Sequence, residues 1–313
     1  MKCLLCSSTN VKILESHPKK ELADLWVDLY PTIDNELKLD EIKIYKCPTC
    51  NLKFFDPKLA GGDKFYSALG ELDWYYLHPG KTEYDYVQKY IKTNNKVLDI
   101  GSGRGVLYTK TKTIIDYTGI ELSTKAVQLA KNAGINVLQE DIATHAQKNQ
   151  GKYDLACLFQ VLEHLTELEN FIQSIHLTLK SKGLFVIAVP NNDGFISYTS
   201  NYTFNLPPHH TILWTESSLK YMANKYNFDV IEVEKEFLQD VHKEAAYHAY
   251  IVSLFRKMLF LPNLLINKNS WNYRLNRVVN KLLRIKFFNI VLMNLAKKRV
   301  KDGQSIIITL QKK

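Results

Sequence analysis

The feature that most constrains the fold of this chain is a regular alternation of short apolar strands with helix-length segments from residue 96 onward. The predicted strands span residues 96–100, 117–122, 136–141, 153–161, 183–190, 228–237 and 305–310. Ser123 is a good cap for one intervening helix, and a capping box at Thr166 predicts another that ends near Gly183. This alternation predicts an α/β fold with a mostly parallel, doubly wound sheet.

Glycines and acidic residues gather at the carboxyl ends of these strands, where parallel sheets bind their ligands. The first strand runs through Asp99 into a turn that contains Gly101 and Gly103, and such glycines let the backbone approach a ligand closely. The third glycine of a dinucleotide fingerprint would fall on Val106, so the turn argues against an NAD site. The second strand reaches Glu121, which is well placed to accept hydrogen bonds from two ribose hydroxyls.

Four motifs, in this order and spacing, resemble those of class I S-adenosylmethionine-dependent methyltransferases: Asp-Ile-Gly-Ser-Gly-Arg-Gly, Gly-Ile-Glu-Leu-Ser, Glu-Asp-Ile and Gln-Val-Leu-Glu-His-Leu. The resemblance covers residues 80–237 and the terminal strand, and it implies a Rossmann-like sheet of seven strands. The cofactor residues that it implies are Asp99, Gly101 and Gly103 for the methionine part, Glu121 for the ribose, Asp141 and Ile142 for the adenine, and Phe159 and Gln160 for the sulfonium end. Two interpretations stay open for Glu163 and His164, a structural cap and a substrate contact.

Four of the five cysteines form two Cys-x-x-Cys pairs, Cys3 with Cys6 and Cys47 with Cys50, while Cys157 stands alone in an apolar run. Two such pairs supply four thiolates, the ligand set of a closed tetrahedral zinc site. We therefore expect a zinc-ribbon module over residues 1–65 with a structural rather than catalytic zinc. The alternative is four cysteines with no common role.

The module and the Cys-Pro-Thr-Cys-Asn-Leu-Lys-Phe-Phe-Asp-Pro run together resemble zinc-ribbon methyltransferases that act on sugars in surface-polysaccharide and deoxysugar pathways. This resemblance implies a small-molecule or saccharide acceptor, nucleotide- or lipid-linked, methylated on a hydroxyl or on carbon. A sugar hydroxyl needs a base, and His210 fits the family pattern best, with its neighbour His209 as the alternative. The competing interpretation is that both histidines only pack their loop under Trp214.

Aromatic residues are dense between the predicted module and the sheet. They are Phe65, Tyr66, Trp74, Tyr75, Tyr76, Tyr84 and Tyr86. They are expected to bury the module against the large domain, and a lid that stacks on a ligand is the second interpretation.

The net charge of +9 is unevenly distributed along the chain. Residues 256–313 hold 14 Lys or Arg and one acid, whereas residues 1–255 hold 27 bases and 31 acids. The predicted insertion 239–303 carries an amphipathic helix, with Arg274, Arg277, Lys281 and Arg284 on one face and Leu275, Val278, Val279, Leu282 and Ile285 on the other. Such a helix suits an anionic membrane surface, a diphosphate-linked sugar or nucleic acid, or it simply packs on the sheet.

An RNA methyltransferase is therefore the alternative function, with the ribbon and the basic insertion holding the nucleic acid. The near-balanced charge of the ribbon region and the absence of an Asn/Asp-Pro-Pro-Tyr/Phe motif make nucleic acid the less favoured partner. A third hypothesis is a protein that only binds the cofactor, which the intact glycine turn argues against.

The domains predicted are a zinc ribbon (1–65), a methyltransferase domain (66–238), a basic helical insertion (239–303) and the last strand of the methyltransferase sheet (304–313). No apolar run is long enough to cross a membrane, and the N-terminus lacks the pattern of a secretory signal. The expected location is cytoplasmic, with peripheral attachment to the inner face of the membrane as the further expectation.

Overall fold

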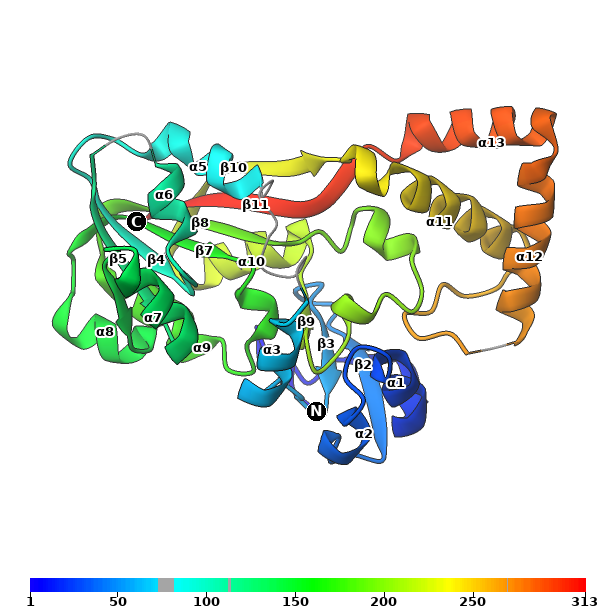
Figure 1. Ribbon diagram of the computed structural model, residues 1–313, viewed down its shortest axis with the longest axis horizontal. Helices are drawn as coiled ribbons and strands as arrows, with labels where there is room; N and C mark the ends of the chain where they lie inside the picture. The colour runs from blue at the N-terminus through cyan, green and yellow to red at the C-terminus, as the bar shows by residue number, and fades with distance from the viewer. Residues whose placement is uncertain (73–81, 112–113, 269) are drawn as a thin grey trace.

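The computed structural model describes residues 1–72, 82–111, 114–268 and 270–313, and its centre is a seven-stranded sheet (Figure 1). The strand order is β10-β11-β8-β7-β4-β5-β6. These strands are β4 (Lys96–Ile100), β5 (Asp116–Glu121), β6 (Val137–Gln139), β7 (Tyr153–Phe159), β8 (Leu179–Pro190), β10 (Phe228–Phe237) and β11 (Asp302–Lys312). In the described part of the chain, β11 pairs antiparallel with both β8 and β10, and the other neighbouring strands of this sheet pair in parallel. All seven predicted strands are present, and the predicted fold class is confirmed.

Helices cover both faces of this sheet. One face packs against α8 (Ile142–Lys148), α9 (Glu169–Thr178) and α10 (Glu216–Lys225). The other packs against α5 (Thr82–Val87), α6 (Val106–Lys110) and α7 (Thr124–Asn132), with the short helix η1 (Gln88–Tyr90) following α5. Alternate residues of β4 serve the two cores, with Val97 on the α7 side and Leu98 on the α9 side. The sheet is thus doubly wound, as the alternation predicted.

The prediction for the helix after residue 166 was wrong at both ends. Helix α9 starts at Glu169, its N-cap residue is Leu168, and no side chain caps it. It ends at Thr178 because Leu179 already pairs with Tyr153, which extends β8 towards its N-terminus. The predicted helical end near Gly183 is therefore part of a strand.

The N-terminal region folds around a second, four-stranded antiparallel sheet of order β1-β2-β3-β9. Its own strands are β1 (Lys12–Pro18), β2 (Glu41–Lys46) and β3 (Lys53–Asp56), and its helices are α1 (Lys19–Trp26), α2 (Ile33–Glu36) and α3 (Asp63–Leu69). The fourth strand, β9 (Ile212–Leu213), belongs to the segment that follows β8 in the large domain. The two sheets are therefore joined by backbone pairing.

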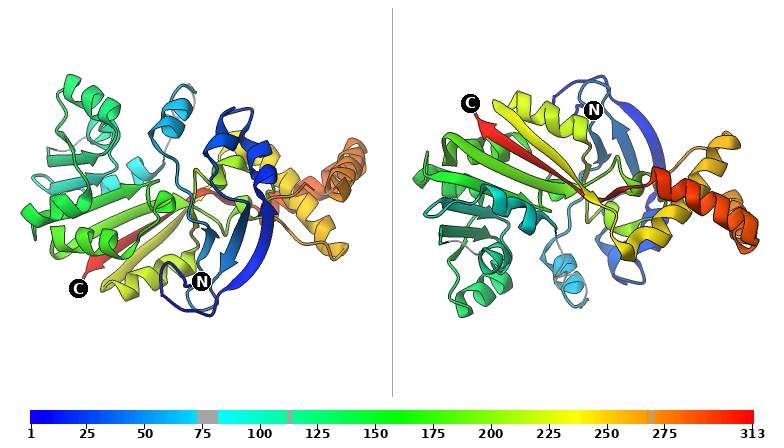
Figure 2. Two further views of the ribbon diagram at one scale, coloured as in Figure 1. Left: turned by 90° about the horizontal axis from the view of Figure 1, so that it is seen from below. Right: turned by 90° about the horizontal axis from the view of Figure 1, so that it is seen from above.

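The four cysteines also share a core with the large sheet. Cys3, Cys47 and Cys50 lie in the same cluster of buried side chains as Trp214 and Met222. Trp214 lies just before α10, and Met222 is part of that helix. Figure 2 shows the N-terminal sheet between the large sheet and the helices of the insertion.

The insertion consists of α11 (Asp240–Met258), α12 (Ser270–Arg284) and α13 (Lys286–Arg299), between β10 and β11 (Figure 1). Its core includes Ala246, Ile251 and Val279 and joins that of the short helix η3 (Phe195–Tyr198). Leu275 and Val279 are buried as predicted, but Val278 and Ile285 of the same predicted apolar face are exposed. Every helix within the described residues is too short or too polar to span a bilayer.

Candidate functional site

The glycine turn after β4 has a backbone that other residues rarely adopt. Gly101 and Gly103 have φ angles of 67° and 54°. A Cβ at Gly101 would lie 2.5 Å from Val161 Cγ2, whereas a Cβ at Gly103 would meet nothing within 4 Å. Gly101 is therefore required for packing, and Gly103 leaves open space in which a ligand can approach the backbone.

Glu121, at the end of β5, is bound to this turn. One carboxylate oxygen accepts from the N–H of Gly103 at 2.9 Å. The other accepts from the N–H groups of Leu122 and Ser123 at 2.8 and 2.9 Å. The carboxylate is half-buried, and its position beside Gly103 is where the sequence analysis expected a ribose ligand.

Asp99 is buried on β4, at 4% exposure, and accepts a 2.8 Å hydrogen bond from the Tyr117 hydroxyl. Burial, and then the Asp99 charge, raise the pKa of Tyr117 far above its ordinary value. Asp99 therefore lies beneath the turn, consistent with a supporting or water-mediated contact.

The two residues expected at the adenine are engaged in helix α8. Asp141 is its N-cap and accepts from the Thr144 N–H at 2.9 Å and the Thr144 hydroxyl at 2.8 Å. These bonds lower the pKa of the Asp141 carboxyl. Ile142 is buried at 4% exposure, whereas the capping carboxylate is exposed. The adenine role of both residues stays a prediction.

The end of β7 places Phe159 and Gln160 at the same edge of the sheet. Phe159 is buried and makes an edge-to-face contact with Tyr84, with ring centroids 5.6 Å apart. Gln160 has a φ angle of 56°, and its amide donates to Ser305 Oγ at 3.2 Å and to Glu83 Oε1 at 3.4 Å. A left-handed backbone is unfavourable for a residue other than glycine, so the surrounding structure must hold Gln160 in this conformation.

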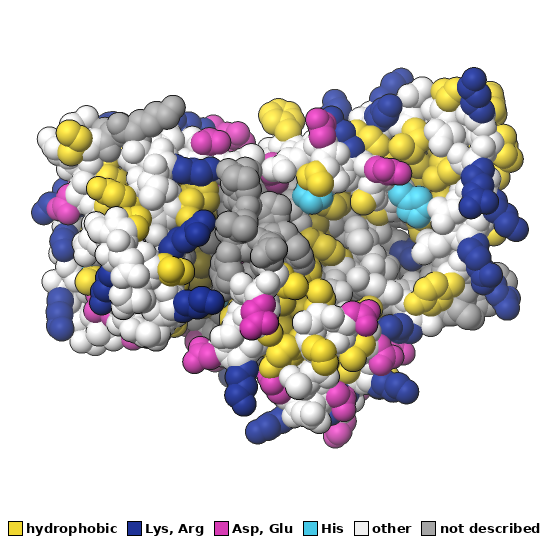
Figure 3. All heavy atoms as spheres, viewed as in Figure 1, with side chains coloured by type: hydrophobic (Ala, Val, Ile, Leu, Met, Phe, Trp, Pro, Cys, Tyr) yellow, Lys and Arg dark blue, Asp and Glu magenta, His cyan; other side chains and the backbone are white. Residues whose placement is uncertain are grey.

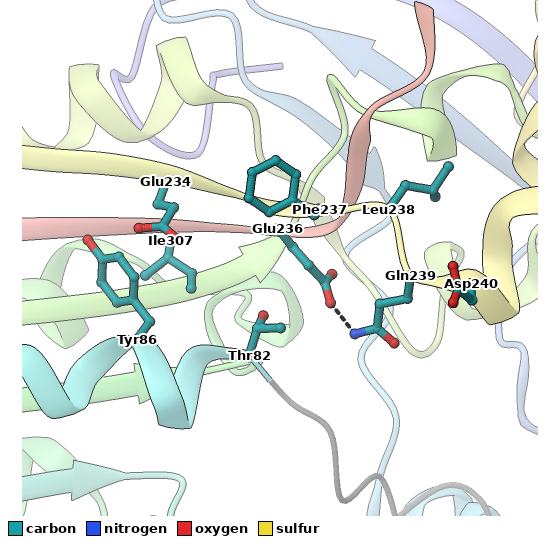
Figure 4. Close-up of a pocket in the computed structure, with 9 residues that line it drawn as sticks. All are labelled: Thr82, Tyr86, Glu234, Glu236, Phe237, Leu238, Gln239, Asp240 and Ile307. Atoms are coloured by element: carbon teal, nitrogen blue, oxygen red, sulfur yellow. Dashed lines mark hydrogen bonds between the residues drawn. The ribbon is translucent and has the colours of Figure 1, made fainter. Parts of the chain in front are cut away.

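A cavity of about 430 Å³ opens at the carboxyl end of β10 (Figure 4). Tyr86 and Thr82 enter it from α5, and the Glu236 carboxylate and the Gln239 amide face each other across it. Its lining residues are Thr82, Tyr86, Glu234, Glu236, Phe237, Leu238, Gln239, Asp240 and Ile307. It lies at the carboxyl end of β10, and the Glu236 carboxylate beside it already accepts hydrogen bonds from the Gln239 amide and from the N–H groups of Gln304 and Ser305.

The structure brings three histidines together, His164, His209 and His210, which we call the histidine cluster. One ring nitrogen of each lies within 4.8 Å of one from each of the others. Their ring centroids are 4.4 to 5.0 Å apart. The sequence analysis selected His209 and His210 but left His164 undecided, because contacts between loops 45 residues apart are not readable from spacing.

Burial controls the protonation of two of these rings. Burial and then the neighbouring His164 lower the pKa of His209 to about 3. Burial, followed by His209 and His164, lowers the pKa of His210 well below its ordinary value. Both rings are therefore neutral at pH 7 and available as proton acceptors or ligands.

The N-terminal module forms one wall of the histidine cluster. The Trp26 indole N–H donates to the carbonyl of Pro207 at 2.7 Å, and the Gly61 N–H donates to that of Pro208, also at 2.7 Å. The hydroxyl of Tyr66, in α3, lies 3.2 Å from Nδ1 of His164. Sequence reasoning missed Tyr66 as a site residue, and its place in the aromatic stretch was the available signal.

The remaining described members of that stretch divide between the two parts of the protein: Phe65 lies in the core of the N-terminal module and reaches His209, with ring centroids 6.4 Å apart, whereas Tyr84 and Tyr86 pack within the large domain. Phe65 is buried under Trp26, with ring centroids 5.1 Å apart, and Tyr86 donates to Glu232. Trp74, Tyr75 and Tyr76 lie outside the described residues.

The four cysteines converge as the two Cys-x-x-Cys pairs predicted. Cys3 Sγ lies 3.4 Å from Cys50 Sγ, and Cys6 Sγ lies 3.5 Å from Cys47 Sγ. All four sulfurs lie within 4.8 Å of one another.

The two loops have the same backbone design. The residues after Cys6 and Cys50, Ser7 and Asn51, both have φ angles of 59°. Their N–H groups donate to the carbonyls of Cys3 and Cys47 at 3.0 and 2.9 Å. The residues fit a tetrahedral metal, whose sulfur ligands would be about 3.8 Å apart at a metal–sulfur distance of about 2.3 Å.

Comparisons with known proteins identify similar proteins for the large domain. Residues 81–233 match a family model described as a methyltransferase domain. Two similar curated proteins are ubiquinone biosynthesis O-methyltransferases. The one from Pectobacterium carotovorum subsp. carotovorum is 30% identical over 28% of this chain and 40% of its own length. The one from Escherichia fergusonii is 29% identical over 32% and 44%. The chain thus spans less than half the length of the curated relatives it matches.

Among solved structures, a SAM-dependent methyltransferase from Archaeoglobus fulgidus aligns with 77% of this chain and 100% of its own, at 20% identity and a TM-score of 0.47.

Proposed function

We propose that this chain is a class I S-adenosylmethionine-dependent methyltransferase and that it methylates a sugar hydroxyl of a nucleotide- or lipid-linked saccharide; the match of residues 81–233 to a methyltransferase domain supports the reaction. The observation that carries the proposal is the arrangement at the carboxyl edge of the sheet. Glu121 and the open side of Gly103 follow β5 and β4, while the histidine cluster follows β7 and β8. A cofactor site and a set of proton acceptors thus share one edge.

The residues of the turn fit S-adenosylmethionine, which when bound supplies a methyl group already activated on a sulfonium. Gly103 leaves room for the backbone to contact the methionine part, and Asp99 supports the turn from below. Glu121 is the proposed ribose ligand, Asp141 and Ile142 the proposed adenine contacts, and Phe159 and Gln160 the proposed neighbours of the sulfonium.

The acceptor hydroxyl would lose its proton at the histidine cluster. His210, with His209 as the alternative, is neutral and can accept a proton. Its loop is fixed by the contacts of Pro207 and Pro208 with the N-terminal module, which suits a positioned proton acceptor.

The saccharide acceptor is supported by the four-cysteine module, the part that this chain has in common with the sugar-modifying methyltransferases it resembles. That module forms a wall of the histidine cluster, where it can contact an acceptor. The curated relatives are named O-methyltransferases, which supports oxygen over carbon. Their name places them in ubiquinone biosynthesis, so a phenol is the acceptor to test beside a sugar.

We further propose that Cys3, Cys6, Cys47 and Cys50 hold one structural zinc. Three of these thiols are buried and that of Cys6 is half-buried, and four cysteine sulfurs at these distances are the ligand set of a closed zinc site. Such an ion leaves no open position for chemistry.

The outer surface of the insertion is proposed to attach to anionic membranes. Arg277, Lys281 and Arg284 are exposed on α12, and α13 exposes Phe287 and Ile290. In Figure 3, Lys and Arg side chains line the outer edge of the insertion with apolar side chains between them. Exposed cations beside exposed apolar groups are the composition of an interfacial helix.

Thermal-shift measurements with S-adenosylhomocysteine present test the acceptor class. A panel of nucleotide sugars, a polyprenyl-linked sugar, a simple phenol and an RNA hairpin would be compared. We expect a nucleotide or lipid-linked sugar to raise the melting temperature beyond the effect of S-adenosylhomocysteine alone. A shift with the phenol or the RNA alone would contradict the saccharide proposal.

A further inference from the structure

We propose that His164, His209 and His210 form a binding site for a divalent transition-metal ion, distinct from the four-cysteine site. Binding of the ion is argued from geometry alone. Its part in activating an acceptor rests on the proposed function.

The three rings are fixed by contacts between two segments. His164 lies in the short helix η2 (Leu162–His164), after β7, while His209 and His210 lie in the loop after β8. The Thr211 N–H donates to the carbonyl of Glu163 at 2.9 Å, and the Thr211 hydroxyl donates to that of Leu165 at 2.7 Å. These hydrogen bonds hold the segment of His164 against the loop of His209 and His210, so the backbone itself brings the three residues together.

The hydrogen bonds of the rings select one tautomer. Nδ1 of His164 lies 2.5 Å from the carbonyl oxygen of His209, and Nδ1 of His209 lies 2.9 Å from that of Phe204. Nδ1 of His210 lies 3.2 Å from Oδ1 of Asn205. A carbonyl or amide oxygen can only accept, so each Nδ1 carries a hydrogen, and Nε2 is the nitrogen that each ring, when neutral, can offer to an ion.

This pattern is the one that metal-binding histidines show. A ligating histidine donates its other ring N–H to a carbonyl or carboxylate, which fixes the ring and its tautomer. Asn205 is itself held, because its amide donates to Asn192 Oδ1 at 2.9 Å. Each of the three adjacent rings has such a hydrogen bond at Nδ1, and this shared pattern favours a metal site over simple packing of the loop.

The surroundings supply charge and exclude water. The Glu163 carboxylate is 1% exposed, and its Oε1 lies 3.9 Å from Nε2 of His164. Trp26, Phe65 and Phe204 pack around His209, with ring centroids 5.4 to 6.4 Å away. A buried carboxylate next to three imidazoles suits a divalent cation electrostatically.

The ligand set indicates the class of ion. Imidazole suits zinc, iron, copper and nickel, while magnesium prefers oxygen ligands. With metal–nitrogen distances of about 2.0–2.1 Å, tetrahedral coordination requires the nitrogens to be about 3.3 Å apart, so the rings must move inward from their present spacing. An ion held this way keeps an open position and would lower the pKa of a coordinated hydroxyl. With the ion bound, His210 would act as a ligand in place of the base role proposed above, and the Glu163 carboxylate would be the proton acceptor.

The test is a cobalt(II) titration of the full-length, metal-free protein, followed by visible absorption and without S-adenosylmethionine. We expect two bound cobalt ions per chain, one with strong thiolate charge-transfer absorption and one with only the weaker bands of nitrogen and oxygen ligands. His164→Gln, on the most exposed ring of the cluster, should weaken the second ion by about 100-fold or more and leave the thiolate bands intact. His248→Gln, at a half-buried position of α11 outside the cluster, is the matched control that should bind both ions.

One cobalt per chain in the wild-type protein, with thiolate bands alone, would overturn the proposal, as would a second ion retained by His164→Gln. The number of cobalt ions bound by the wild-type protein is itself a test of the proposal, so the result stands even if a variant misfolds. The titration needs neither cofactor nor acceptor. A failure of the metal proposal can therefore be distinguished from a failure of the proposed methyl transfer.

Discussion

The backbone N–H of Thr211 donates to the carbonyl oxygen of Glu163 at 2.9 Å, and this bond sets the loop of His210 beside the end of β7. Phe55, on β3 of the N-terminal sheet, donates its N–H to the carbonyl of the same Thr211 at 3.1 Å. One residue therefore connects the large sheet, the histidine cluster and the N-terminal module.

Loss of the Glu121 carboxylate should weaken S-adenosylmethionine binding. Glu121→Ala should reduce the binding free energy by about 1.5–3 kcal/mol, the usual effect of removing a charged hydrogen-bond partner. The variant also frees the Gly103 N–H, so circular dichroism should confirm the fold. Titration calorimetry measures the affinity, with the exposed surface variant Glu167→Ala as the control. An affinity equal to that of the wild-type protein would exclude Glu121 from the cofactor site.

Removal of one zinc ligand should affect more than the N-terminal module. Cys47→Ser should lose the metal and, because the cysteines share a core with Trp214 and α10, should also lower the melting temperature of the whole protein. Elemental analysis and calorimetry provide the measurements, and Thr49→Ala in the same loop is the control. Protein purified without chelator that holds no metal would refute the zinc site.

Charge reversal on α12 should release the protein from anionic vesicles. We expect the wild-type protein to co-sediment with vesicles containing anionic lipid at low salt and not at 0.5 M salt, since each well-placed cation contributes about 1 kcal/mol. Arg277→Glu, Lys281→Glu and Arg284→Glu together should abolish this binding. The same reversal at exposed Lys12, Lys20 and Lys38 of the N-terminal module should not. Recovery in the supernatant under all conditions would end the membrane proposal.

Acid should weaken the contact between β10 and the helices that precede β4. Hydrogen bonds from Lys89 and then Tyr90 lower the pKa of Glu232 to about 2. Its ordinary value is about 4.3, so its stabilising effect is complete above that pH and is lost as the pH falls towards 2.

Urea unfolding at pH 6, 4 and 3 measures this effect. Because the Glu232 side chain is 41% exposed, we expect less than about 1 kcal/mol. Glu232→Gln should reduce the acid sensitivity, and Glu167→Gln should not. If the unfolding free energies of the two variants depend on pH in the same way, the loss of stability in acid comes from groups other than Glu232.

The large sheet was predictable because strand and helix periodicities are local signals. The seven strands and the two cysteine loops follow from residues close together in sequence. Strand β9 could not be predicted, since two residues, Ile212 and Leu213, gain strand geometry only by pairing with β3. The histidine cluster was predictable only in part for the same reason. His209 and His210 are adjacent in the sequence, whereas His164 joins them only through tertiary contacts.

Loss of His210 should separate turnover from cofactor binding. His210→Ala should reduce turnover by about 10²–10⁴, the range for a general base, and a lost metal ligand would act in the same direction. The affinity for S-adenosylmethionine should not change, because the glycine turn and Glu121 are independent of the loop. A variant with most of its activity would move the role to His209 or show that the acceptor needs no base.

The most direct test of the account is transfer of an isotope-labelled methyl group from S-adenosylmethionine by the wild-type protein. The acceptors are nucleotide- and lipid-linked sugars, a phenol and RNA, and the products are identified by carbon-13 NMR and mass spectrometry. The account predicts a labelled methoxy group on a sugar, formed by the wild-type protein and nearly lost in His210→Ala. A labelled methyl group on the phenol or on RNA, with none on any sugar, would contradict it.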